Sequence, residues 1–170
     1  SSVIGDCAPI LLGPGGDLKE LDATNRAKVE SPIISEFLDS ASRNGYDPLL
    51  SRAMVTVGTE VWWLENTQTH AREFVSADTK KVRIDDVAED ERQWQLVESV
   101  EVPTLNHPFT IHQPIDAGDQ LLTMSQYEAV AYGFAKGIAG DASTLADKLG
   151  LTQAPPRLDM SGWEKFAGWL

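Results

Sequence analysis

Cysteine and positive charge are both scarce in this chain. Cys7 is the single cysteine, so no internal disulfide can form and the sequence leaves the redox compartment undetermined. The 170 residues include 14 lysines and arginines against 26 aspartates and glutamates, which gives a formal net charge of −12. An acidic surface repels phosphate backbones and does not suit an anionic membrane face. The composition therefore argues against nucleic acid as a partner.

Long apolar runs are absent as well. No segment reaches transmembrane length, and we find no signal peptide, internal repeat or low-complexity tract. With 42% hydrophobic and 24% charged residues, the composition is that of an ordinary globular protein, and 170 residues can bury a real core. We expect one domain over residues 1–154. Pro155-Pro156 marks a break, and the tail 155–170 is amphipathic.

Histidine is also rare, and the candidate metal or nucleophile motifs have simpler explanations. His107 and His112 are five residues apart and point to opposite faces of an extended segment, which disfavours a shared metal. No neighbour of Cys7 lowers its pKa, which predicts a small buried side chain. Gly13-Pro14-Gly15-Gly16 lacks the ending of a phosphate loop, and the acidic residues in 85–91 lack the pattern of a calcium loop. We therefore expect neither a metal nor another cofactor.

Helical spacing of apolar residues predicts a long first helix with two possible starts. Either Thr24 or Asn25 caps this helix, which places Lys28 in its first turn, or Ser31 caps it with Pro32 as the first helical residue. Further helix signals follow along the chain: a stop at Asn44-Gly45, a short second helix from Asp47-Pro48, a helix over Gln126–Phe134 capped by Ser125, and a last helix over Ala142–Leu149.

The apolar period changes from helical to alternating after Gly58. Thr59–Leu64 and Arg72–Val75 are rich in β-formers and flank a polar stretch, which predicts a β-hairpin. Trp62 and Trp63 point to opposite faces of that hairpin, so we expect one indole in the core and the other free for a partner or another copy of the chain.

More short strands are expected beyond the hairpin. A charged loop or short helix should separate them from it. The expected segments are the loop or helix at 76–92 and strands at Trp94–Val102, Phe109–His112, Gln120–Thr123 and Gly137–Ala139.

Lys28 is the candidate catalytic residue. It lies between a loop rich in glycine and an apolar helix pattern. A charged lysine is costly in apolar surroundings, burial lowers the pKa of a lysine, and the neutral amine can act as a general base. From the residues alone, a solvated surface lysine is the alternative.

Four segments between residues 4 and 135 carry a family likeness. They are Ile4-Gly5-Asp6-Cys7-Ala8-Pro9-Ile10, then Lys28-Val29-Glu30-Ser31 heading a long helix, then Asn44-Gly45-Tyr46 with Ala53-Met54-Val55, and finally the stretch from Leu122 to Ala135. In this order they resemble the membrane-bound serine proteases of the NfeD type, within the Clp-protease/crotonase superfamily and near signal peptide peptidase A.

The resemblance implies an α/β fold of the Clp-protease/crotonase-like type, a ββα spiral, with residues 58–112 as an inserted β-hairpin region. It implies a Ser-Lys endopeptidase in which a serine attacks the peptide carbonyl and a lysine takes its proton. Lys28 matches that lysine, although Pro32 departs from a regular helix start. No residue matches the serine, and the glycine-rich segment that supplies oxyanion-hole amides is missing. We expect the C-terminal part of a protease domain, inactive unless a preceding segment completes it.

The resemblance also implies partners and a location. The substrate would be an apolar stretch of a membrane-associated protein, cleaved by a homo-oligomer on the periplasmic side of a bacterial membrane. Membrane attachment would come through segments absent here, to which the tail 155–170 leads. Two alternatives are a non-catalytic oligomeric scaffold on the same fold, assembling through the hairpin and its tryptophans, and an acyl-CoA enzyme of the crotonase group, which the Lys28 segment disfavours.

Overall fold

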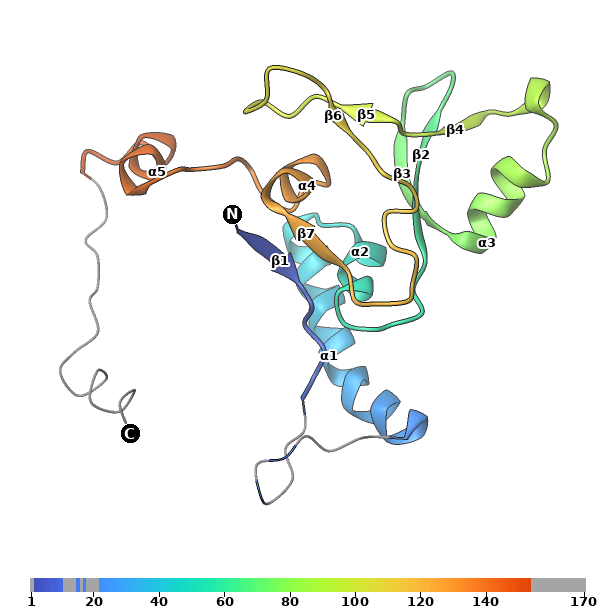
Figure 1. The fold of residues 1–170 in the computed structure, drawn as a ribbon, viewed down its shortest axis with the longest axis horizontal. Coiled ribbons are helices and arrows are strands. Elements are labelled where there is room, and N and C mark those ends of the chain that lie inside the picture. Colours follow the sequence, from blue (N-terminus) through green and yellow to red (C-terminus); the bar gives the residue numbers. More distant parts are fainter. Residues whose placement is uncertain (1, 11–14, 16, 18–21, 154–170) are drawn as a thin grey trace. The chain divides into compact units, whose positions relative to one another are not determined.

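A computed structural model of the chain describes residues 2–10, 15, 17 and 22–153 (Figure 1). The chain divides into two compact units, Ser1–Lys136 and Gly137–Leu170. Helices and small antiparallel sheets alternate along the first unit, which confirms the expected mixture of α and β structure. Within the described ranges, no helix is both long and apolar enough to cross a membrane.

Helix α1 spans Ala23–Asn44 and begins earlier than either predicted start. Its N-cap is Asp22, whose carboxylate accepts the backbone N–H of Asn25 at 3.0 Å. Both predicted starts are therefore wrong, because Asp22 caps the helix ahead of Thr24 and Asn25, and Pro32 lies inside the helix. The predicted end is confirmed, since Gly45 takes the left-handed φ of 70° that a helix stop requires.

Helix α2 spans Pro48–Ala53 and follows as predicted. The Asp47 carboxylate accepts the backbone N–H groups of Leu49 and Leu50 at 2.8 and 3.0 Å, and Pro48 occupies the first helical position. The helix packs against α1 and carries Leu50 and Ala53, both fully buried, into the core.

The main sheet has three antiparallel strands in the order β3-β2-β4, and it confirms the predicted hairpin. Its strands are β2 at Val61–Asn66, β3 at Arg72–Ser76 and β4 at Trp94–Leu96. Three short helical segments connect β3 to β4 in the region predicted as loop or short helix: α3 at Ala77–Lys80, η1 at Lys81–Asp85 and η2 at Glu89–Glu91.

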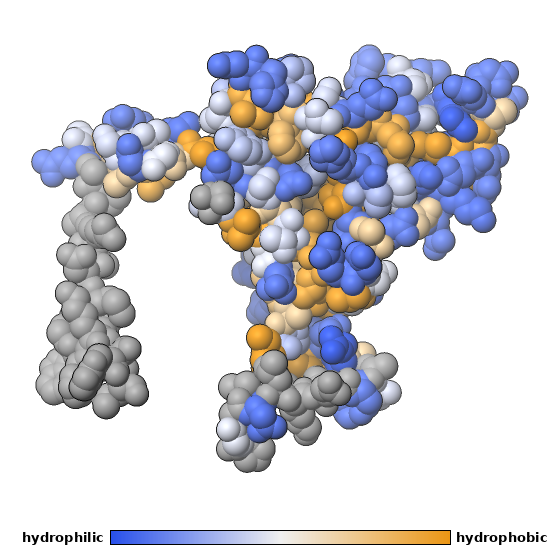
Figure 2. All heavy atoms as spheres, in the orientation of Figure 1, coloured by the Kyte–Doolittle hydropathy of each residue, from blue (hydrophilic) through white to orange (hydrophobic). Residues whose placement is uncertain are grey.

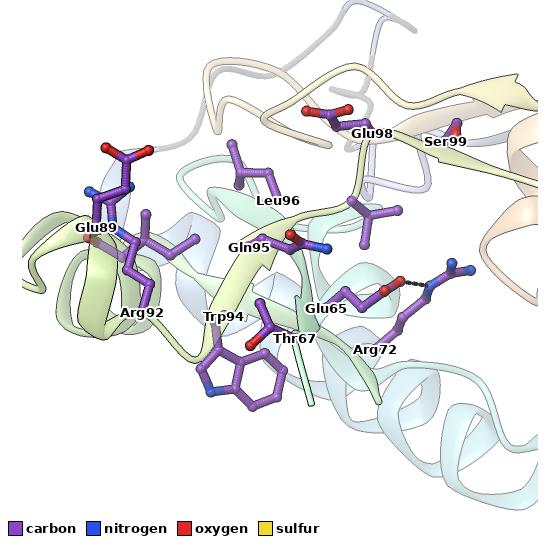
Figure 3. Close-up of a pocket in the computed structure, with 12 residues that line it drawn as sticks. Glu65, Thr67, Arg72, Glu89, Arg92, Trp94, Gln95, Leu96, Glu98 and Ser99 are labelled. Carbon is purple, nitrogen blue, oxygen red and sulfur yellow. Dashed lines mark hydrogen bonds and ion pairs between the residues drawn. The ribbon is translucent and has the colours of Figure 1, made fainter. Parts of the chain in front are cut away.

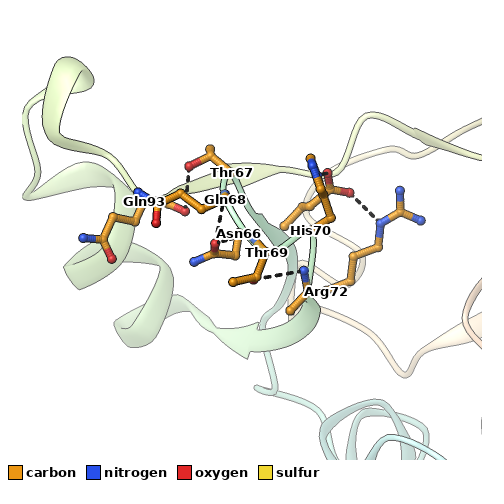
Figure 4. Close-up of polar contacts among 9 residues, drawn as sticks. Asn66, Thr67, Gln68, Thr69, His70, Arg72 and Gln93 are labelled. Atoms are coloured by element: carbon orange, nitrogen blue, oxygen red, sulfur yellow. Dashed lines mark hydrogen bonds and ion pairs between the residues drawn. The ribbon is translucent and has the colours of Figure 1, made fainter.

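The turn of the hairpin is held by side-chain hydrogen bonds (Figure 4). The Asn66 side-chain oxygen accepts the backbone N–H groups of Gln68 and Thr69 at 3.0 and 2.9 Å. Thr67 donates both its backbone N–H and its hydroxyl to the carbonyl of Gln93, at 2.9 and 3.2 Å. These bonds join the turn to the residue that precedes β4, so the start of β4 is fixed against the hairpin.

The single strand predicted over 94–102 is wrong, because the chain changes partner within it. The Val97 N–H bonds to the Trp63 carbonyl at 3.0 Å, whereas the Glu98 carbonyl accepts the Ile111 N–H at 2.8 Å. Successive residues of a strand direct their backbone groups to opposite edges, so one edge pairs with β2 and the other with a later segment. The later pairing forms β5 at Ser99–Val100 and β6 at Phe109–Thr110.

A separate two-stranded sheet joins the two ends of the first unit. Strand β1 at Val3–Gly5 pairs antiparallel with β7 at Thr123–Ser125, which lies later than the predicted strand at 120–123. Helix α4 follows at Gln126–Ala131 with the predicted Ser125 cap, completed by Glu128 in a reciprocal pair of hydrogen bonds. The predicted extension to Phe134 is wrong, because Gly133 takes a φ of 82° that ends the helix.

Two clusters of buried side chains form the core of the first unit. The larger joins α2, β2 and β7 and contains Trp63, which is 5% exposed and stacks on Phe74 at 4.8 Å between ring centres. The smaller lies on the other face of the main sheet and contains Leu64, Val75 and Ile84. Of the two neighbouring tryptophans, Trp63 is thus the core residue, as one of the pair was predicted to be.

The second unit contains helix α5 at Ala142–Lys148, which confirms the last predicted helix. The Asp141 carboxylate caps it by accepting the Thr144 N–H at 2.7 Å. The strand predicted at Gly137–Ala139 is wrong, since this segment has no regular structure and is not buried. The amphipathic tail at 155–170 lies outside the described residues.

Candidate functional site

Lys28 lies in the second turn of α1, on a face of small residues. A shallow depression of about 850 Å³ follows this face and is lined by Thr24, Ala27, Lys28, Ser31, Pro32 and Ser35. The residues recur at helical spacing, so they form one stripe along the helix. Because most of these side chains are short, another polypeptide segment can approach the helix backbone closely here.

Pro32 acts directly on the backbone of Lys28. In a helix the N–H of residue 32 would bond to the carbonyl of residue 28, and proline has no N–H. The Lys28 carbonyl therefore lacks its ordinary partner within α1. Lys28 and Pro32 are thus one helical turn apart, and the backbone hydrogen bond that would ordinarily join them is absent.

The Lys28 side chain is exposed, which corrects the expectation of a poorly hydrated amine. In the described part of the chain, Lys28 forms no ion pair. Glu30, the buried acid of α1, contacts other residues instead. Glu30 is 7% exposed and lies 3.5 Å from the Thr56 hydroxyl and 4.0 Å from the Arg26 guanidinium. The apolar residues of α1 face the body of the first unit, so Lys28 is left on the solvent side.

Cys7 and Gly5 belong to the Ile-Gly segment, and both have structural explanations. Cys7 is half-buried rather than buried, and burial together with the Asp6 charge raises the pKa of its thiol, which disfavours the nucleophilic thiolate. Gly5 has a φ of 134°, and a Cβ at this position would collide with the Leu122 carbonyl. Gly5 thus permits the close approach of β1 to β7.

An apolar groove of about 460 Å³ runs between β1 and the C-terminal half of α1. Ile4, Phe37, Met54 and Phe134 line it together with Cys7. The Cys7 N–H donates to the Met54 carbonyl at 2.8 Å, so the groove floor joins the segment after β1 to the end of α2.

A second and more polar cavity, of about 660 Å³, lies beside β4 (Figure 3). On one side of it, Arg72 Nε donates to Glu65 Oε2 at 2.6 Å, and His70 Nδ1 lies 3.2 Å from Glu65 Oε1. These bonds hold the pKa of the Glu65 carboxyl below its usual value. On the other side, Arg92 Nε donates to the backbone carbonyls of Ile84 and Val87.

The tryptophans of the sheet are covered by cations. Lys80 Nζ lies 4.5 Å from the centre of the Trp62 ring, and Arg83 Cζ lies 4.5 Å from that of Trp94. Trp62 is half-buried, and its indole N–H donates to Glu60 at 2.6 Å. The second indole of the hairpin is therefore engaged within the chain rather than fully free for a partner.

The remaining motifs are solvated where they are described. His107 and His112 are exposed, as are the acidic residues at 85, 86 and 89–91. The ranges that the structure describes hold no group of three histidine, cysteine or carboxylate side chains that is arranged to bind a metal. Most of the Gly13–Gly16 loop lies outside those ranges.

Asp116 is a buried acid that the sequence did not single out. Its Oδ1 accepts the Gly118 N–H at 2.7 Å, while its Oδ2 has no hydrogen-bond partner among the residues that the structure describes, and burial raises the pKa of this carboxyl. Its backbone pairs with Val61, which fixes residues 116–118 against the start of β2. An aspartate two residues before a glycine is a common turn signal, which explains the local bond but not the burial.

Comparisons of this chain with protein-family models, with curated proteins and with solved structures find no match.

Proposed function

We propose that this chain is part of a Ser-Lys endopeptidase domain of the Clp-protease/crotonase-like type, with Lys28 as the general base. The nucleophilic serine would come from a polypeptide segment that these 170 residues do not contain. The substrate would be an apolar stretch of a membrane-associated protein, and the protein would act as a homo-oligomer on the periplasmic side of a bacterial membrane.

The observation that carries the proposal is the packing of the segments that resemble the family. The Leu122 N–H donates to the Ala53 carbonyl at 2.9 Å, and the Asp6 N–H donates to the Leu122 carbonyl at 3.1 Å. Together with the Cys7–Met54 bond, these contacts join three segments that are far apart in sequence. Such mutual contact supports the resemblance, because chance sequence matches scattered along a chain have no reason to lie next to one another in the fold.

The open side of β1 supports a missing neighbour. Among the described residues, the sheet of β1 and β7 has two strands, and Val3 and Ile4 of β1 are 71% and 44% exposed. A two-stranded sheet is marginal in water and is stabilised by further strands on an apolar face. A preceding segment of the protease domain would supply them.

The same segment would convert Lys28 into a base. An exposed ammonium is charged and cannot accept a proton, whereas covering it removes water and favours the neutral amine. The short side chains of Ala27, Ser31 and Ser35 leave room for such a cover. Lys28 would then take the proton of the serine hydroxyl as that oxygen attacks the peptide carbonyl, and return it to the leaving amine.

Variants of Lys28 in a longer protein that includes the serine segment test this role. We expect Lys28→Ala and Lys28→Arg both to reduce peptide cleavage by at least about a hundredfold, because arginine keeps the charge but does not deprotonate. Lys81→Ala, which removes an exposed lysine elsewhere, should leave cleavage unchanged. Full activity of Lys28→Arg would contradict a base, and casein hydrolysis by the 170 residues alone would contradict the need for another segment.

A non-catalytic scaffold on the same fold is the second candidate, and the exposure of Lys28 favours it. Assembly through the hairpin tryptophans has less support, since Trp63 is buried and Lys80 already covers Trp62. The scaffold predicts that Lys28→Ala leaves the oligomeric state and every measurable property of the longer protein intact. Cleavage by the parent that Lys28→Ala abolishes, with sedimentation unchanged, would support the protease, whereas an oligomer that cleaves nothing in either form would support the scaffold.

A further inference from the structure

One edge of β4 has no partner strand within the described ranges of the chain. Thr67 N–H donates to the Gln93 carbonyl and Val97 N–H to the Trp63 carbonyl, so residues 93, 95 and 97 direct their backbone groups toward β2. By the alternation of an antiparallel pair, Trp94 and Leu96 direct theirs to the opposite edge. In the part of the chain that the structure describes, no backbone or side-chain hydrogen bond uses those four groups.

The free edge of β4, called the slot below, is short and is limited at both ends. At one end, the Glu98 carbonyl accepts the Ile111 N–H, so β6 already pairs with the continuation of the same edge. At the other end lies the segment of Glu89 and Arg92, which Arg92 fastens through its bonds to two backbone carbonyls. The slot therefore accepts a short extended backbone in line with β6.

Residues from both faces of the sheet line the cavity beside this edge. Glu65, Thr67 and Gln95 line it from one face, and Ile84, Trp94 and Leu96 line it from the other. Figure 3 shows β4 passing between Glu65 and Arg72 on one side and Glu89 and Arg92 on the other. Figure 2 shows hydrophilic residues predominating over the region of α3 and β4, with hydrophobic residues visible between them.

We propose that the edge of β4 binds an extended peptide as an added antiparallel strand, one in which apolar residues alternate with basic ones. Peptide residues opposite Trp94 and Leu96 would exchange four backbone hydrogen bonds with them and place their side chains on the apolar face, beside Ile84. The intervening residues would lie on the polar face with Glu65 and Gln95.

The charge of the cavity as a whole favours basic residues in the peptide. Arg72 is paired with Glu65, whereas Arg92 donates to neutral backbone carbonyls and keeps its charge. The charged side chains that line the cavity, Glu65, Glu89 and Glu98 against Arg72 and Arg92, therefore sum to −1. Glu89 and Glu98 form no ion pair within the described residues, and the chain as a whole carries a net charge of −12. A cationic peptide is therefore attracted to the cavity, and a phosphorylated or acidic one is repelled. This binding goes beyond the proposed protease activity and requires neither Lys28 nor a serine.

Backbone methylation of a peptide tests the binding without altering the protein. The probe is a capped, fluorescent peptide of about seven residues in which valine alternates with lysine, and its affinity for the chain is measured by fluorescence polarisation. In the proposed pairing the valine amides face β4 and the lysine amides face away. We expect N-methylation of the valines to weaken binding by at least about tenfold and N-methylation of the lysines to leave it nearly unchanged.

Variants of the chain provide a second readout. Glu98→Lys should weaken binding of the lysine-containing peptide several-fold, whereas Glu101→Lys, the same charge change outside the cavity, should have a smaller effect. Equal loss with both methylated peptides, or no loss with either, would overturn the proposal, as would binding only when the lysine amides are free. Failure of the peptide to bind, together with self-association of the chain that Glu98→Lys disrupts, would assign the edge to a second copy instead and would equally overturn it. Because the probe needs no cleavage, failure here leaves the Lys28 proposal untouched.

Discussion

At the scale of single residues, Asp116 has a buried carboxyl oxygen without a hydrogen-bond partner in the described part of the chain, and its burial makes stability depend on pH. Burial raises the pKa of Asp116 in the folded chain, with a smaller contribution from Asp119. The folded state therefore holds this proton more tightly than the unfolded state does. It follows that folding stability falls as pH rises from the unfolded value of 3.8 through the raised pKa.

Replacing Asp116 with asparagine removes that titration while keeping an oxygen for the Gly118 N–H. We expect Asp116→Asn to increase the free energy of unfolding by about 1 kcal/mol at about pH 7, and to differ little from the parent at about pH 3. Urea unfolding at both values measures this. Asp90→Asn, which removes an exposed carboxyl in another part of the chain, is the matched control, and a parent that is more stable than Asp116→Asn at neutral pH would contradict the argument.

At the scale of elements, the caps and turns could be predicted because they depend on neighbouring residues. Gly45, Asp47 and Ser125 each end or begin a helix as expected, since their effect acts within one helical turn. The division of the strand at Leu96 could not be predicted, because it depends on Ile111, which the fold brings to the other edge. Local patterns do not encode which distant segment covers an edge.

Helix α1 shows the same limit in its interior. Pro32 indicated a helix start, and the chain instead continues through it, because the helix is fixed at its cap by Asp22 and at its far end by packing against α2. The position of Lys28 in the second turn follows from that continuation. For the candidate site, the sequence therefore identified the lysine and the segments around it, but neither its exposure nor the cavity beside β4.

Pro32 should therefore lower the stability of the chain, because it removes a backbone hydrogen bond from α1. Pro32→Ala restores the N–H that the Lys28 carbonyl lacks, and we expect it to raise the free energy of unfolding by about 1–3 kcal/mol and to increase the helical circular dichroism signal. Ser35→Ala, on the same exposed stripe, should gain no more than about 0.5 kcal/mol through helix propensity alone. A destabilised Pro32→Ala protein would mean that the proline is required by packing.

At the scale of the whole molecule, excess negative charge should work against folding. The chain carries a net charge of −12 and its isoelectric point is about 4.5, so the compact state repels itself at neutral pH. Its surface ion pairs, such as Arg43–Asp39 at 2.7 Å, are exposed and contribute little. Salt should therefore weaken the repulsion between the excess negative charges more than it weakens the attraction within ion pairs.

We accordingly expect sodium chloride to stabilise the chain. Between about 0.01 and 0.5 M salt the Debye length falls from about 30 Å to below 8 Å, and the melting temperature should rise by a few degrees. Scanning calorimetry measures the change, and repeating it near pH 4.5, where the net charge vanishes, is the control in which the rise should disappear. A melting temperature that falls with salt at neutral pH would show that local ion pairs such as Arg72–Glu65, at 2.6 Å, outweigh the net repulsion.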